Sequence, residues 1–190
     1  MESMLFAVLF AGCARTEPPV VAAAVDPDPL RTIPVTTASD AARAAFLEAD
    51  ALQVALDDEA AAPLYAQAVA LDPSFAQGWV GVGLGRDDVE ARRDDLAHAA
   101  ELAAGLPPLE RAWIDARAAW SLDAPDALEK MSRVAADAPD DWFVQLTLGD
   151  LARGQGALDV ARSAAERATR IAPDEGIAYN TLAYVLADQG

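Results

Sequence analysis

Small and apolar residues recur along this chain at intervals of four and three, and each such run ends at a proline five residues later. The three clearest runs are Ala61, Tyr65, Ala68 and Pro73; Ala127, Met131, Val134 and Pro139; and Ala161, Ala165, Ala168 and Pro173. Positions three and four apart share one face of an α-helix, and proline cannot continue a helix. The pattern therefore predicts a helix with one apolar face ahead of each of these prolines.

The prolines are themselves periodic, because Pro73 and Pro107 lie 34 residues apart, as do Pro139 and Pro173. A period of about 34 residues is typical of repeats made of two helices and a turn. Ser39 and Asp40 form a plausible helix start at the beginning of the pattern. We expect helical hairpins at about residues 42–75, 76–107, 108–141 and 142–175, with part of a fifth at 176–190, all within one domain at 39–190.

The composition agrees with an all-α fold. Hydrophobic residues make up 53% of the chain, but much of this is alanine, and aromatic residues account for only 6%. Alanine is the best helix former and lets neighbouring helices approach closely, whereas strands need runs of β-branched and aromatic residues that are absent here. Aspartate pairs such as Asp57–Asp58, Asp87–Asp88, Asp94–Asp95 and Asp140–Asp141 are expected at helix starts and turns, where they cap free N–H groups.

The repeats resemble those of tetratricopeptide repeat proteins over about residues 42–190. Leu148 and Gly149 occupy the Leu-Gly pair of that motif, Trp79 its tryptophan position in the second hairpin, and Pro173 its closing proline. Leu182 follows Leu148 by 34 residues. The resemblance implies a right-handed α-solenoid of antiparallel helix pairs. The chain departs from the family pattern where Pro107 and Pro139 are only 32 residues apart, and at Asp95, where a small apolar residue is expected.

The same resemblance implies a scaffold that binds a protein or peptide partner in a concave groove lined by the first helix of each pair. In the two best-matching repeats the residues expected to line it are Phe143, Leu146, Asp150, Arg153, Ile177, Asn180 and Tyr184. Members that capture a C-terminal carboxylate use several lysines and asparagines there. This chain offers only Arg153 and Asn180, so we do not expect that mode.

Charge and motifs exclude several other functions. The formal net charge of −17 argues against nucleic acid and favours a basic or neutral partner. The glycines from Gly78 to Gly85 fit neither a dinucleotide fingerprint nor a phosphate-binding loop. His98 is the single histidine, and no Gly-x-Ser-x-Gly motif occurs. We therefore predict no catalytic residue, no metal site and no cofactor.

The amino terminus has the features of a secretion signal. An apolar run from Met4 to Gly12 stands directly before Cys13, the single cysteine, and is too short to span a bilayer. It resembles the lipobox of bacterial lipoproteins, although Phe10 is unusual and no basic residue precedes the run. The resemblance implies a signal at 1–12, acylation of Cys13, a proline-rich flexible tether at 13–38 and a place in the bacterial cell envelope. The alternative is an ordinary buried cysteine in a cytoplasmic protein.

Two other functions stay open on the sequence. The repeats could be the non-catalytic region of a longer enzyme or regulator, or a structural envelope lipoprotein that self-assembles. Gly190 follows Gly156 by 34 residues and corresponds to the glycine of the turn within a hairpin. We therefore expect the array to be truncated after Gly190.

Overall fold

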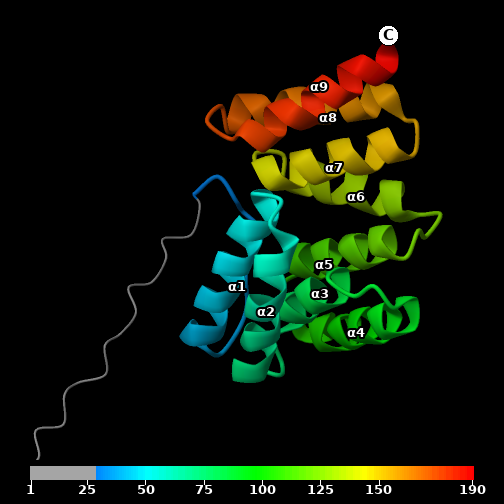
Figure 1. Ribbon diagram of the computed structural model, residues 1–190. Coiled ribbons are helices and arrows are strands. Elements are labelled where there is room, and N and C mark those ends of the chain that lie inside the picture. Colours follow the sequence, from blue (N-terminus) through cyan, green and yellow to red (C-terminus); the bar gives the residue numbers. More distant parts are fainter. Residues whose placement is uncertain (1–28) are drawn as a thin grey trace, which may run out of the picture.

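The computed structural model describes residues 29–190 (Figure 1). Cys13, the expected signal and most of the expected tether lie outside the described residues. Within 29–190 the chain forms α-helices, one short 3-10 helix and no strand, so the expected all-α fold is confirmed. The helices are α1 (Asp40–Val54), α2 (Asp58–Leu71), α3 (Ala76–Leu84), α4 (Val89–Leu102), η1 (Ala103–Gly105), α5 (Pro108–Ser121), α6 (Ala127–Asp137), α7 (Trp142–Gly154), α8 (Leu158–Ile171) and α9 (Gly176–Gln189).

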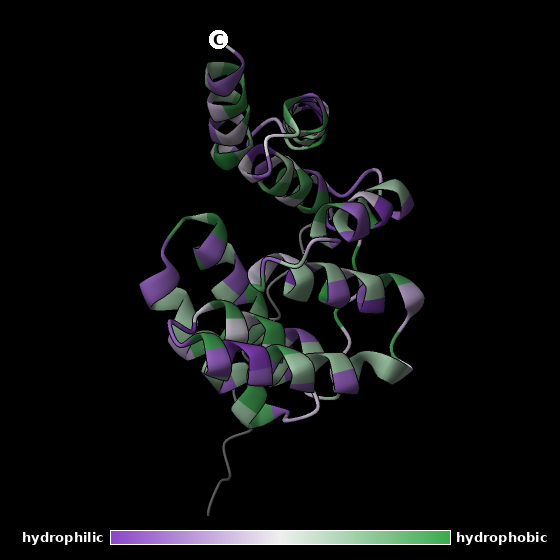
Figure 2. Ribbon diagram, turned by 90° about the vertical axis from the view of Figure 1, so that its right-hand side faces the viewer, coloured by the Kyte–Doolittle hydropathy of each residue, from purple (hydrophilic) through white to green (hydrophobic). Residues whose placement is uncertain are grey.

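Consecutive helices form the expected antiparallel pairs. α1 packs on α2, α3 on α4, α5 on α6 and α7 on α8, while α9 packs against α7 and α8. The pairs stack in chain order, and Figure 1 shows the α1–α2 hairpin standing at an angle to the rest of the stack. α3 contacts α5 and α7 contacts α9, but the link from α5 to α7 runs mainly through α6. Hydrophobic and hydrophilic residues alternate around these helices, as befits helices that bury one face (Figure 2).

Aspartates begin several of the helices, as the sequence predicts. Asp57 accepts a hydrogen bond from the N–H of Ala60 at 3.1 Å, and Asp88 accepts one from the N–H of Ala91 at 2.8 Å. Each satisfies a donor that the first turn of a helix leaves without a partner. Asp95 differs because it lies within α4, where it forms an ion pair of 2.8 Å with Arg86.

Small residues sit where the helices approach most closely. A Cβ atom added at Gly149 in α7 would lie 3.5 Å from the carbonyl oxygen of Ala161 and 3.4 Å from Cγ2 of Thr181. Ala161 and Ala168 are fully buried in α8. The turn between α7 and α8 contains Gly156 at φ +74°, whereas the turn between α1 and α2 places Leu56 at φ 62°. These positions explain the periodic small residues of the sequence.

Residues 30–38, here called the strap, run in extended form across the ends of three helix pairs. Three buried carboxylates hold them. Asp141 accepts hydrogen bonds from the N–H groups of Thr32 and Ile33, the latter at 3.1 Å. Glu110 accepts from Thr36, at 2.9 Å from the N–H and 2.6 Å from the hydroxyl.

The third carboxylate, Asp72, accepts from the N–H of Ala38 at 3.1 Å and from the hydroxyl of Thr37. All three carboxylates are less than a tenth exposed. Residues 30–38 fall in the segment expected to be a flexible tether, and the structure differs there because each carboxylate satisfies backbone donors of the segment. Hydrogen bonds to charged groups are about twice as strong as neutral ones.

Candidate binding groove

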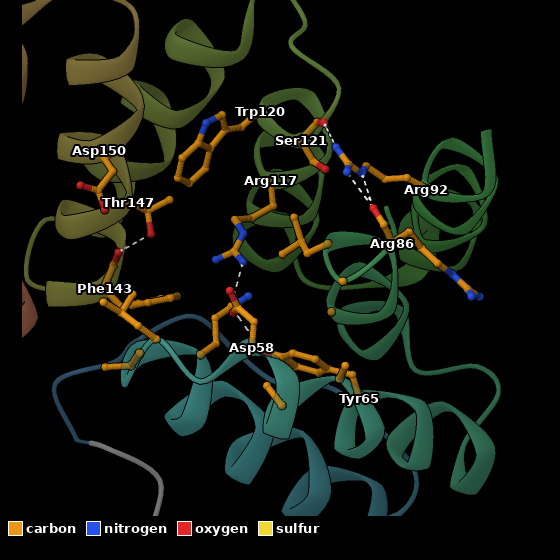
Figure 3. A pocket seen from close by; sticks show the side chains of 18 of the residues that line it. Asp58, Tyr65, Arg86, Arg92, Arg117, Trp120, Ser121, Phe143, Thr147 and Asp150 are labelled. Carbon is orange, nitrogen blue, oxygen red and sulfur yellow. Dashed lines mark hydrogen bonds between the residues drawn. The ribbon is translucent and has the colours of Figure 1, made fainter. Parts of the chain in front are cut away.

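A cavity of about 460 Å³ lies between the α1–α2 hairpin, α3, α5, α7 and the start of α9. Leu84, Trp120, Leu146 and Ile177 give it apolar walls, and Asp58, Arg86, Arg92 and Asp150 are among its charged groups. Figure 3 shows Trp120 and Arg117 of α5 on one side of the cavity and Asp58 and Tyr65 of the α1–α2 hairpin on the other. We call this cavity the groove.

The sequence-predicted binding residues divide into two groups. Phe143, Leu146, Asp150 and Ile177 line the groove. Phe143 and Leu146 expose only 7% and 4% of their surface, so they form its floor rather than its rim.

Arg153, Asn180 and Tyr184 do not line the groove. The guanidinium of Arg153 forms an ion pair of 2.7 Å with Asp188 and lies 4.9 Å from the ring centre of Tyr184. Asn180 borders an adjoining hollow that shares Leu56 and Ile177 with the groove. The structure therefore does not bring the seven predicted residues together into one site.

The least expected residue of the groove is Arg117 on α5. It lines the groove although only 8% of its surface is exposed. Its Nη2 donates to the side-chain oxygen of Gln53 at 3.3 Å, and its guanidinium carbon lies 5.1 Å and 5.7 Å from the ring centres of Trp113 and Phe143. Its buried Nε has no hydrogen-bond partner among the described residues. Burial lowers the pKa of Arg117, and the nearby Asp50 opposes that effect.

Asp50, on α1, is engaged by other residues. It is 4% exposed, pairs with Arg31 of the strap, and lies 3.1 Å from the hydroxyl of Tyr65. Burial and the carboxylate of Asp50 raise the pKa of Tyr65, so this hydroxyl stays neutral and donates. Arg31 also lies over the ring of Phe143, with 4.2 Å from its guanidinium carbon to the ring centre. Through Arg31, the strap thus contacts Phe143 of the groove floor.

Two charged side chains at the groove, Arg92 and Asp150, form hydrogen bonds within the chain. Arg92 donates to the carbonyl oxygens of Arg86 at 2.7 Å and of Ser121 at 3.3 Å, which joins α4 to the end of α5. Asp150 accepts from the hydroxyl of Thr181 at 2.9 Å, and partial burial raises the pKa of Asp150. These contacts fix the rim in place.

The sequence contains a signal for Arg117 that the repeat pattern does not reveal. Trp113, Arg117 and Trp120 share one face of α5, at spacings of four and three. Trp113 is buried in the core, but Trp120 is only partly buried and borders the groove. A cation between two aromatic residues on one helix face is the sequence feature that indicates Arg117.

Among residues 29–190, no group of three or more metal-binding side chains comes together. No described helix is long and apolar enough to cross a membrane.

No protein-family model matches the chain, and no curated protein does. Several solved structures resemble it. One is that of YrrB, a TPR protein with an unusual peptide-binding site, at 21% identity and a TM-score of 0.45, covering 78% of this chain and 77% of YrrB. Another is that of MamA, at 19% identity and a TM-score of 0.45, covering 80% of this chain and 84% of MamA. Likeness at this level carries no argument about the groove, whose function has to be inferred from its own residues.

Proposed function

We propose that this chain is a helical-repeat scaffold that binds a peptide segment of a partner protein in the groove. The observation that carries the proposal is the groove itself. Its volume lies within the usual range for ligand sites, and apolar side chains of three successive first helices (α3, α5 and α7) line it together with a few polar groups. Leu84, Trp120 and Leu146 would supply the apolar contacts that carry most of the energy in peptide recognition.

A groove-filling variant tests this function. Ala62 is an exposed residue of α2 that lines the groove, whereas Ala97 is an exposed residue of α4 outside it. Random dodecapeptides displayed on phage are selected on the immobilised full chain, and the affinity of a selected peptide is then measured by fluorescence anisotropy. Ala62→Trp should weaken binding by at least about tenfold, and Ala97→Trp should leave it unchanged. Equal affinity for both variants would place the binding surface elsewhere.

We further propose that Cys13 is acylated and holds the scaffold at a membrane of the bacterial cell envelope. Support comes from the apolar run before Cys13 and from the prolines that follow it, which favour an extended spacer. Intact-mass analysis of protein extracted from membranes should show a mass increase of acyl groups on the wild type and none on Cys13→Ser. An unmodified Cys13 in the membrane fraction would end this part of the proposal.

A further inference from the structure

We infer that the groove selects a peptide segment carrying an acidic side chain, and that the carboxylate of this side chain pairs with Arg117. The inference rests on the proposed peptide binding and adds to it the chemistry of the ligand. The observation behind it is a buried Arg117 that forms no ion pair within residues 29–190 and whose Nε has no hydrogen-bond partner there.

Burying a guanidinium is costly unless it is paired and hydrogen-bonded. Within residues 29–190, Arg117 forms no ion pair with a carboxylate, and its Nε lacks a hydrogen-bond partner. Its contacts are a long hydrogen bond to the amide of Gln53 and two aromatic faces. Figure 3 shows the side chain extending from α5 toward the α1–α2 hairpin at the groove. A ligand carboxylate in the groove would supply the missing partner.

The strap explains why the protein does not supply this partner itself. Asp50 is close enough to Arg117 to affect its charge, and Arg31, Asp50, Tyr65 and Arg117 line one small cavity behind the groove floor. Arg31 forms an ion pair with Oδ2 of Asp50, and the hydroxyl of Tyr65 donates a hydrogen bond to Oδ1. Both oxygens of Asp50 are thus engaged by Arg31 and Tyr65, and no ion pair joins Asp50 to Arg117 within residues 29–190. The docked strap therefore keeps Arg117 available to a ligand.

The other charges of the groove favour a single carboxylate over a phosphate. The lining contains three arginines and three aspartates: Arg86, Arg92, Arg117, Asp58, Asp87 and Asp150. Arg86 is paired with Asp95, and Arg92 is bound to two carbonyl oxygens, which leaves Arg117 as the lining arginine without such partners. One cation matches one negative charge, and a dianion would face the three aspartates. The net charge of −17 acts on the rate of encounter rather than on this pairing.

The walls indicate what flanks the acid. Trp120 and Leu146 border the groove, and Phe143 contacts the guanidinium of Arg117 through its ring. An apolar residue adjacent to the acid would fill this space. The expected ligand is thus a short segment in which aspartate or glutamate stands beside a leucine, phenylalanine or similar side chain.

The test uses the peptides selected on the full chain, as described above, and two matched variants. Arg117→Met removes the buried charge and keeps an unbranched side chain that ends at about the position of Nε. Arg133→Met makes the same charge change at an exposed position on α6 outside the groove. Wild type and Arg133→Met should select peptides enriched in aspartate or glutamate over the starting library. Arg117→Met should lose this enrichment and bind the selected peptide at least about tenfold more weakly.

The peptide offers a second measurement, whose first comparison uses the wild type alone. An analogue with asparagine in place of the selected aspartate should bind wild type about tenfold more weakly, and should bind Arg117→Met no more weakly than the acidic peptide does. Arg31→Met, which frees Asp50 from its ion pair and also removes the cation over the Phe143 ring, should weaken binding of the acidic peptide.

The outcomes separate the two proposals. Selected peptides without acidic enrichment, or equal binding of the acid and amide peptides to wild type, would overturn the role of Arg117 and leave peptide binding in place. Failure to select any peptide on the wild type would overturn both.

Discussion

Replacing Asp141 by asparagine should detach the strap and destabilise the protein more than its small chemical change suggests. Asp141 is 1% exposed and uses both of its oxygens. Oδ1 accepts from the N–H groups of Phe143 at 3.1 Å and Val144 at 3.0 Å, at the start of α7. Oδ2 accepts from the N–H groups of Thr32 and Ile33. An asparagine presents one acceptor oxygen and one N–H₂ donor, so in either orientation two backbone donors face a donor.

The expected loss of stability follows from the two hydrogen bonds that the asparagine cannot accept. A hydrogen bond to a charged group contributes about 1.5–3 kcal/mol to stability. A buried donor that is left without a partner also costs the free energy of removing it from water. Allowing for relaxation of the strap, we expect Asp141→Asn to lower the free energy of unfolding by about 3 kcal/mol. Asp57→Asn is the matched control, because Asp57 is exposed, begins α2 and accepts from one N–H group. Asparagine caps a helix about as well as aspartate, so the control should lose at most about 0.5 kcal/mol.

Two measurements at neutral pH check this prediction. Urea unfolding gives the two differences in free energy, and hydrogen exchange of the Thr32 and Ile33 amides reports directly on strap docking. In the wild type these amides should exchange slowly, and in Asp141→Asn at the rate of an unprotected chain. Equal stability of the two variants, or unchanged exchange at Thr32 and Ile33, would refute the assignment of Asp141 as the anchor of the strap.

Three further changes have predictable signs. Gly81→Ala should lower the melting temperature, because its Cβ would lie 2.2 Å from a ring carbon of Tyr65, whereas Gly154→Ala meets nothing within 4 Å and should raise stability by up to about 1 kcal/mol. A melting temperature that rises in both would contradict the packing at Gly81. Ala161→Trp should lower the melting temperature too, since Ala161 is fully buried in α8, and an unchanged value would remove it from the packed interface. Hydrogen bonds from two hydroxyl groups lower the pKa of Asp72 from 3.8 to about 2, so its contribution to stability is present above about pH 4 and lost as the pH falls toward 2. Asp72→Asn should therefore flatten the loss of stability over that range in urea titrations, and an identical pH profile would count against the role of its hydrogen bonds.

The helix pairs were predictable from sequence because their determinants are local. Small and apolar residues at spacings of four and three, closed by prolines such as Pro73 and Pro173, define the second helices α2, α6 and α8 without reference to the rest of the chain. The capping aspartates are equally local, since Asp57 bonds to a residue three positions away. The strap was not predictable in this way. Its prolines and threonines are typical of a spacer, and the carboxylates that hold it are 34 to 109 residues distant.

The groove was predictable only in part, for a similar reason. The family resemblance points to the first helix of each pair, and it places Phe143, Leu146, Asp150 and Ile177 at the groove. It says nothing about the angle of the α1–α2 hairpin, which closes one side with residues of both helices. Nor does periodicity show that Arg117, between two tryptophans, forms no ion pair, since that depends on which residue engages Asp50.

The strap also has a consequence for how the protein is made. Contacts in a helical-repeat array are mostly between neighbours in sequence, so each pair can form soon after its residues leave the ribosome. The strap is synthesised before every helix, yet its anchor at Asp141 comes 109 residues after Thr32. It therefore leaves the ribosome first and docks after α1 to α6 have been synthesised, and closing this long loop adds an entropic cost to an otherwise local folding process. Docking of the strap would mark the point at which four helix pairs built one after another become a single folding unit.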